Sequence, residues 1–92
     1  MPTRTVTIGS TVGLHARPAA IFVKAASEAP VAVTIAKTGG NPVPANSMIA
    51  IMALGAKHGD EVQIAAEGDG ADEALDLLAD LLATDLDAEP AS

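Results

Sequence analysis

The 92-residue chain contains no cysteine, tryptophan or tyrosine, and its one aromatic residue is Phe22. The missing thiols exclude disulfides and thiolate metal sites and allow a reducing compartment. The missing aromatic rings exclude the stacking platform on which single-stranded nucleic acid binds. Aliphatic side chains must therefore fill the core, and nucleic acid is not an expected partner.

The sequence also lacks an apolar run near the ~20 residues that cross a bilayer, and no secretory hydrophobic segment opens it. We therefore expect a cytoplasmic protein without membrane insertion. The length suits one domain with a single modest core. That domain is predicted to span residues 1–87, followed by a disordered acidic tail at 88–92.

Basic residues are missing from the second part of the chain. All five lysines and arginines precede residue 59 with only one acid, Glu28, a balance of +4, whereas eleven acids follow. A weakly basic patch is thus expected on a protein of net charge −7. Such a patch attracts acidic or phosphorylated partners, and the acidic remainder repels nucleic acid. The alternative is that the acids only keep the domain soluble.

The hydrophobic pattern predicts a mixture of strands and helices. Alternating apolar and polar residues predict strands at 3–8, 31–36 and 61–67, with a weak edge strand at 42–45 that contains two prolines. Helical spacing predicts helices at 16–27, 48–54 and 72–86. Because each helix and each strong strand has one apolar face, we expect an α+β fold in which helices pack on one side of a sheet.

The faces of the two long helices can be assigned from their periodicity. In the first, the inner face holds Ala19, Phe22, Val23 and Ala26, and the outer face holds Arg17, Ala20 and Lys24. In the last, the buried side holds Leu75, Leu78, Ala79, Leu82 and Leu86. Asp85 and Asp87 oppose the helix dipole there, so fraying is expected at this end.

The most informative residue is His15, in the run Gly13-Leu14-His15-Ala16-Arg17-Pro18-Ala19. Proline suits the first turn of a helix, and the unpaired N–H groups of a helix start bind anions. A histidine there can hold a phosphoryl group on a ring nitrogen, with its oxygens held by the backbone of Ala16 and Arg17 and by the Arg17 guanidinium. The same positive charges predict a His15 pKa below the ordinary value of about 6.5. The alternatives are a capping or packing histidine and a solvated arginine.

Ser47 precedes the short helix and is predicted to cap its N-terminus, a contribution of ~1 kcal/mol. Gly55 is a suitable terminator for that helix. The apolar residues of this segment cannot all face inward. We therefore expect an exposed docking patch formed by Met48, Ile49 and Met52, for which flexible methionine is well suited.

Two segments resemble the HPr family, the histidine-containing phosphocarrier proteins of the bacterial phosphoenolpyruvate-dependent sugar phosphotransferase system. Residues 13–19 resemble its active-site signature, and residues 47–55 resemble its regulatory serine motif. The resemblance implies a four-stranded antiparallel sheet covered on one face by three helices, an open-faced two-layer sandwich in the order βαββαβα. It also implies that the first and second strands are parallel and separated by the last, so no crossover rule is violated.

The resemblance implies a phosphoryl carrier rather than an enzyme with turnover. His15 would accept a phosphoenolpyruvate-derived phosphoryl group from phosphorylated Enzyme I, through Nδ1, and pass it to a sugar-specific Enzyme IIA, without a cofactor. Arg17 would contact the phosphoryl oxygens, and a serine kinase and phosphatase would act on Ser47. The implied partner surface of this monomer comprises Arg17, Ala20, Lys24, Met48, Ile49 and Met52.

Other functions fit the sequence less well. One is a regulatory paralogue serving a nitrogen-type relay, and another is an interaction module in which His15 never carries phosphate. A hydrolase with His15 as general base lacks an accompanying nucleophile or oriented carboxylate. A zinc site joining His15 to His58 lacks cysteines and suitable ligand spacing, so no metal is expected.

Overall fold

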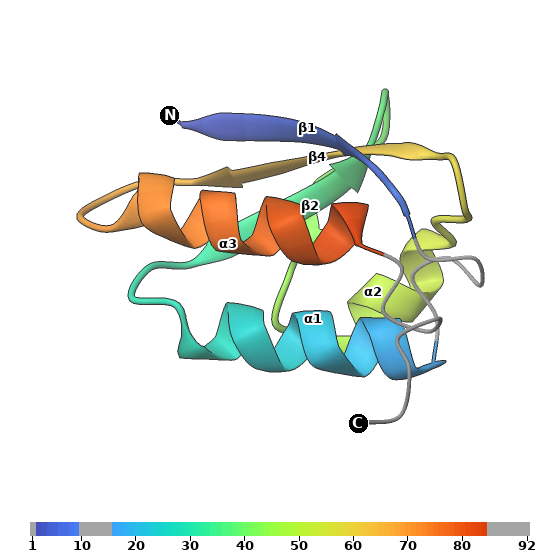
Figure 1. Cartoon of the computed structure of the whole chain (residues 1–92), viewed down its shortest axis with the longest axis horizontal. Coiled ribbons are helices and arrows are strands. Elements are labelled where there is room, and N and C mark those ends of the chain that lie inside the picture. The colour runs from blue at the N-terminus through green and yellow to red at the C-terminus, as the bar shows by residue number, and fades with distance from the viewer. Residues whose placement is uncertain (1, 10–15, 85–92) are drawn as a thin grey trace.

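The computed structural model describes residues 2–9 and 16–84, which form a sheet with helices on one face (Figure 1). The elements are β1 (Thr3–Thr7), α1 (Ala16–Glu28), β2 (Val33–Lys37), β3 (Val43–Pro44), α2 (Met48–Leu54), β4 (Glu61–Ala66) and α3 (Ala71–Ala83). The strand order is β1-β4-β2-β3, and every pair is antiparallel. β4 therefore separates the parallel strands β1 and β2. The predicted α+β fold, including its element order, is confirmed.

The core lies between the sheet and the helix layer. β4 shows the alternation that places it there, since Val62 and Ile64 are buried whereas Gln63 is exposed. The largest fully buried side chains are Phe22, Ile8, Ile35, Ile51, Ile64, Leu75, Leu78 and Val62. Aliphatic residues thus fill the core, as the scarcity of aromatic residues predicted. No helix in the described part of the chain is long and apolar enough to span a membrane.

The inner and outer faces of α1 were predicted correctly. Its buried residues are Ala19, Phe22 and Ala26, Val23 is partly buried, and Arg17, Ala20 and Lys24 are exposed. The following strand begins at Val33, two residues later than predicted. The last residue of β4, Ala66, pairs with Val33, so the chain before Val33 has no ladder partner.

α3 also differs from the prediction, because it ends at Ala83 rather than near Leu86. Thr84 is extended, and its N–H and hydroxyl donate to the Asp80 carbonyl at 3.1 and 2.7 Å. These two bonds satisfy a carbonyl of the last turn without another helical residue. Leu75, Leu78 and Leu82 are buried and Ala79 is partly buried, as predicted, whereas Leu86, Asp85, Asp87 and the proposed tail lie outside the described residues.

The chain after β1 approaches the end of α3 closely at Gly9. Its N–H donates to the Leu82 carbonyl at 2.9 Å. A Cβ at Gly9 would collide with the backbone carbonyl of Ala83. Only glycine fits this contact, which ties the end of β1 to the C-terminal turn of α3.

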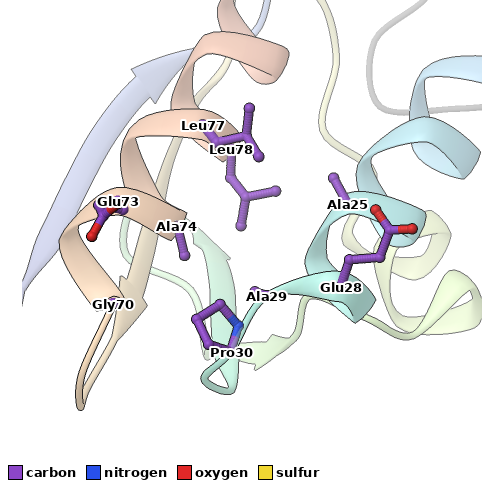
Figure 2. Close-up of a pocket in the computed structure, with 9 residues that line it drawn as sticks. All are labelled: Ala25, Glu28, Ala29, Pro30, Gly70, Glu73, Ala74, Leu77 and Leu78. Atoms are coloured by element: carbon purple, nitrogen blue, oxygen red, sulfur yellow. The ribbon is translucent and has the colours of Figure 1, made fainter.

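Small side chains leave a groove of about 270 Å³ between α1 and α3 (Figure 2). Ala25 lines it from α1, Ala74 lines it from α3, and Ala29 lies directly after the last residue of α1. Pro30 and Gly70 close one end, where Gly70 has φ +87 and a Cβ would stand 2.9 Å from the Pro30 ring. The chain at Pro30 and the chain at Gly70 therefore pack tightly against each other, while the small alanine side chains leave the hollow between the helices open.

Candidate functional site

His15 lies outside the described residues, but the chain is fixed on either side of its segment. Before it, Ile8 donates to the Asp60 carbonyl at 2.9 Å, and the Gly59 N–H donates to the Ile8 carbonyl at 3.0 Å. After it, α1 begins at Ala16. The segment that contains His15 therefore leads directly into the start of a helix, as predicted.

The first turn of α1 carries positive charge. Arg17 is exposed, and that turn contains no acidic residue. The first N–H groups of a helix, here including those of Ala16 and Arg17, have no intrahelical acceptor. This end of α1 therefore offers backbone donors and a guanidinium to an anion.

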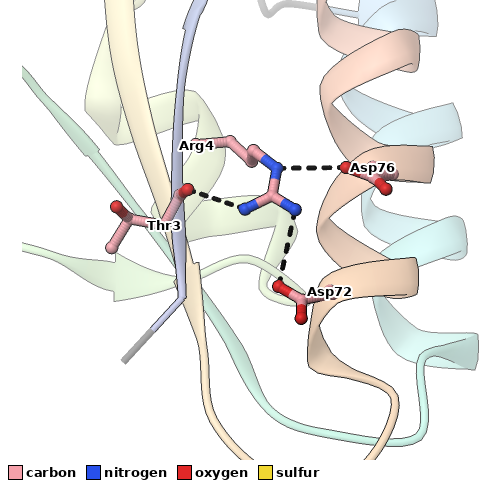
Figure 3. A network of polar contacts seen from close by, with 4 residues as sticks. All are labelled: Thr3, Arg4, Asp72 and Asp76. Carbon is pink, nitrogen blue, oxygen red and sulfur yellow. Dashed lines mark hydrogen bonds and ion pairs between the residues drawn. The ribbon is translucent and has the colours of Figure 1, made fainter.

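Three of the five basic residues lie outside α1, and two of them, Arg4 and Lys37, form ion pairs with acids. Arg4 joins β1 to α3 through Asp76 at 3.0 Å and Asp72 at 3.5 Å, and it also donates to the Thr3 carbonyl at 2.9 Å (Figure 3). Lys37 pairs with Asp60 at 3.4 Å. These pairs correct the expected basic patch, because charge on Arg4 and Lys37 is offset by acids from the second part of the chain.

The positive charge of α1 is not offset in this way. Arg17 and Lys24 have no carboxylate oxygen within 4.0 Å among residues 2–9 and 16–84. Fewer unpaired cations therefore form the basic surface than the sequence indicated. In the described structure, α1 contributes Arg17 and Lys24 to it.

Asp60 stabilises the turn at residues 57–60, whose backbone forms hydrogen bonds with Ile8. Its carboxylate accepts a hydrogen bond from the Lys57 N–H at 2.9 Å, which lowers the pKa of Asp60, and nearby Lys37 lowers it further. The ionised form is therefore the one that holds this turn. His58, within the turn, is exposed.

Ser47 caps α2, as predicted. Its Oγ accepts a hydrogen bond from the Ala50 N–H at 3.2 Å, and Gly55 ends the helix in the left-handed conformation at φ 69. Ile51 is buried and fixes the inner face of α2. The cap is thus observed, while the regulatory phosphorylation of Ser47 stays a prediction.

The outer face of α2 is apolar. Ile49 is 84% exposed and Met52 is 42% exposed, whereas Met48 is partly buried and packs against the core. α2 packs against α1 in the same layer (Figure 1). Two contacting helices therefore present exposed cations and exposed apolar side chains, the combination that the predicted partner surface requires.

Two features were not predicted from sequence. The ion pairs of Arg4 join residues more than sixty positions apart, and no local pattern indicates them. The groove between α1 and α3 depends on small residues such as Ala25 and Ala74, which are also ordinary helix formers.

Known proteins with similar sequences and structures agree on one family. Residues 2–84 match the family model described as the PTS HPr component phosphorylation site. The chain is 50% identical over 90 residues to the phosphocarrier protein HPr of Streptomyces coelicolor, covering 98% of this chain and 97% of that protein. It is 40% identical over 78 residues to the multiphosphoryl transfer protein of Vibrio cholerae, covering 83% of this chain and 20% of that protein.

The fold is similar to the crystal structure of HPr-C-His from Thermoanaerobacter tengcongensis. The TM-score is 0.88 at 39% sequence identity, with 97% of this chain and 99% of that chain covered. The chain therefore belongs to the HPr family, and it is a phosphoryl carrier of the phosphotransferase system, not an enzyme in its own right.

Proposed function

We propose that His15 is the residue that carries the phosphoryl group. The observation that carries this proposal is the exposed Arg17 in the first turn of α1, directly after the segment that contains His15 and without a carboxylate partner in the described structure. A cation and unpaired N–H groups at that position favour an anion on a neighbouring side chain.

In the proposed reaction, a neutral ring nitrogen of His15 attacks the phosphorus of the phosphorylated donor. The bond from phosphorus to the donor breaks in line as the new N–P bond forms. The Arg17 guanidinium and the N–H groups of Ala16 and Arg17 neutralise charge on the phosphoryl oxygens. The second transfer reverses these roles, with the acceptor protein as the attacking group.

We assign donor and acceptor to Enzyme I and to an Enzyme IIA, which would dock on Ala20 and Lys24 of α1 and on Met48, Ile49 and Met52 of α2. The match to one fifth of a multiphosphoryl transfer protein supports this assignment, because a segment similar to this chain is there part of a longer phosphoryl-transfer protein. The phosphoryl group is carried covalently, so no cofactor is needed. We place the relay in the cytoplasm, where phosphoenolpyruvate is formed.

Intact mass spectrometry tests the role of His15. The protein is incubated with Enzyme I and phosphoenolpyruvate, and one acid-labile phosphoryl adduct is expected. His15→Ala removes the adduct, whereas His58→Ala, which changes the other histidine of the chain, retains it. An adduct on His15→Ala contradicts the assignment.

The acceptor is identified in a second step. Phosphorylated protein is mixed with individual Enzyme IIA domains, and loss of the adduct is followed over time. Transfer to a sugar-specific domain is expected. Transfer only to a nitrogen-type domain would instead favour the regulatory paralogue.

A further inference from the structure

The groove between α1 and α3 is apolar and open to solvent (Figure 2). Its walls are the small side chains of Ala25, Ala29 and Ala74, and buried Leu78 also lines it. Leu77 lies at its edge and is 56% exposed. An exposed leucine beside an unfilled hollow of about 270 Å³ is a surface that a large apolar side chain can cover.

Two carboxylates border this groove from opposite helices. Glu28 comes from α1 and Glu73 from α3, and both are exposed lining residues. In Figure 2 the Glu73 carboxylate lies on the side of α3 that faces away from α1, at the outer rim of the groove. Neither has a lysine or arginine nitrogen within 4.0 Å among the described residues. The border of the groove therefore attracts cations, while its interior attracts apolar groups.

The groove is separated from the proposed phosphoryl site. Glu28 is the last residue of α1 and Arg17 is the second, so they stand about 16 Å apart along the helix axis. An occupant of the groove would thus leave the start of α1 uncovered.

We propose that this groove is a second docking site, and that it binds a basic, apolar segment of a partner protein. One large apolar side chain of the segment fills the space beside Leu77. Lysine or arginine residues on either side of it pair with Glu28 and Glu73. The inference does not depend on the phosphoryl-carrier role, and it adds a partner that need not compete with phosphoryl transfer.

Charge selects this occupant over others. Nucleic acid and anionic lipid are repelled by Glu28, Glu73 and the neighbouring acids of α3. An uncharged apolar segment would leave the two carboxylates beside it without cationic partners. A segment that combines cations with one apolar anchor satisfies both parts of the surface.

The site can be tested by NMR titration of the isotopically labelled full chain. The probe is a synthetic amphipathic helix-forming peptide of lysine, leucine and alanine. Amide shifts are expected to be saturable and concentrated at 25–29 and 73–78, and to be small at Arg17 and in α2. Shifts spread evenly over acidic residues, or no saturable shift, would overturn the proposal.

Matched variants separate docking from simple charge attraction. Leu77→Gln removes the exposed apolar side chain at the edge of the groove without changing the charge. The pair Glu28→Lys and Glu73→Lys reverses the charge at the border of the groove. Each is expected to weaken peptide binding by about tenfold. The control, Glu61→Lys with Glu67→Lys, makes the same charge change at exposed positions outside the groove and is expected to weaken binding less than about twofold.

The proposal fails if the control pair weakens binding as much as the groove pair. Dispersed amide spectra of each variant verify folding, and the charge pairs provide the test even if Leu77→Gln unfolds. Sedimentation of the protein alone tests whether a second copy of the chain occupies the groove. Self-association that Leu77→Gln abolishes would assign the groove to a second copy and overturn the proposal.

Discussion

α1 and α3 have the same length and lie in the same layer, yet their exposed faces carry opposite charge. Each is 13 residues long and buries an apolar face against the sheet. α3 has Asp72 and Glu73 in its first turn, which stabilises the helix dipole, whereas α1 has Arg17 there, which opposes it. Folding explains the acids of α3 but not the arginine of α1. A charge that disfavours its own helix is consistent with selection for binding an anion.

The largest expected effect is on the free energy of unfolding, and it tests the buried apolar face that α1 and α3 share. Phe22→Ala on α1 is expected to lower the free energy of unfolding by ~3–5 kcal/mol, and Leu78→Ala on α3 by ~2–5 kcal/mol, because both side chains are fully buried. Urea denaturation followed by circular dichroism measures both. A loss below ~1 kcal/mol in either variant would show that its helix is not part of the core.

The next largest effect is on the rate of phosphorylation, and it tests the opposite charges that the two helices carry in their first turns. Arg17→Glu is expected to slow phosphorylation by Enzyme I about a hundredfold, because an oxyanion donor is lost and a like charge is added. The same change should stabilise α1 by ~0.3–1 kcal/mol, since it favours the dipole. Rates from intact mass spectrometry and unfolding in urea provide the two readouts. Asp80→Lys, a charge reversal of equal size and opposite sign on α3, should alter the rate less than about threefold.

A smaller effect extends the comparison to α2. Ser47→Ala removes the hydrogen bond to the Ala50 N–H and is expected to cost ~1 kcal/mol. Ser27→Ala on α1 is the control, because that hydroxyl only donates back to the Val23 carbonyl within the helix and is exposed. Its expected effect is within ~0.5 kcal/mol. Equal losses for the two serines in urea denaturation would contradict a capping role.

The smallest effect concerns the acids of α3. Arg4→Gln breaks the ion pairs with Asp72 and Asp76 but is expected to cost only ~0.2–1 kcal/mol, because the three side chains are partly or largely exposed. The loss should shrink as salt is raised. Denaturation at low and high ionic strength measures it, with Lys57→Gln as the control. A loss that is large and independent of salt would show that β1 depends on this contact.

Local chemistry predicted most of the elements, and contacts distant in sequence account for what it missed. The helix start at Ala16, the Ser47 cap and the exposed Ile49 follow from periodicity and capping preferences. The strand order came from the resemblance alone, since periodicity does not specify neighbours. The late start of β2 depends on where β4 ends, and the groove depends on the distance between two helices. Neither property belongs to a single segment.

The proline of β3 has a consequence beyond the site. β3 is the outermost strand next to β2, and Pro44 pairs with Thr34 there. An open sheet edge invites a strand from another molecule, which is the first step toward fibrils. Proline has no N–H to donate, and a strand of two residues offers little to extend. This margin is therefore protected against aggregation.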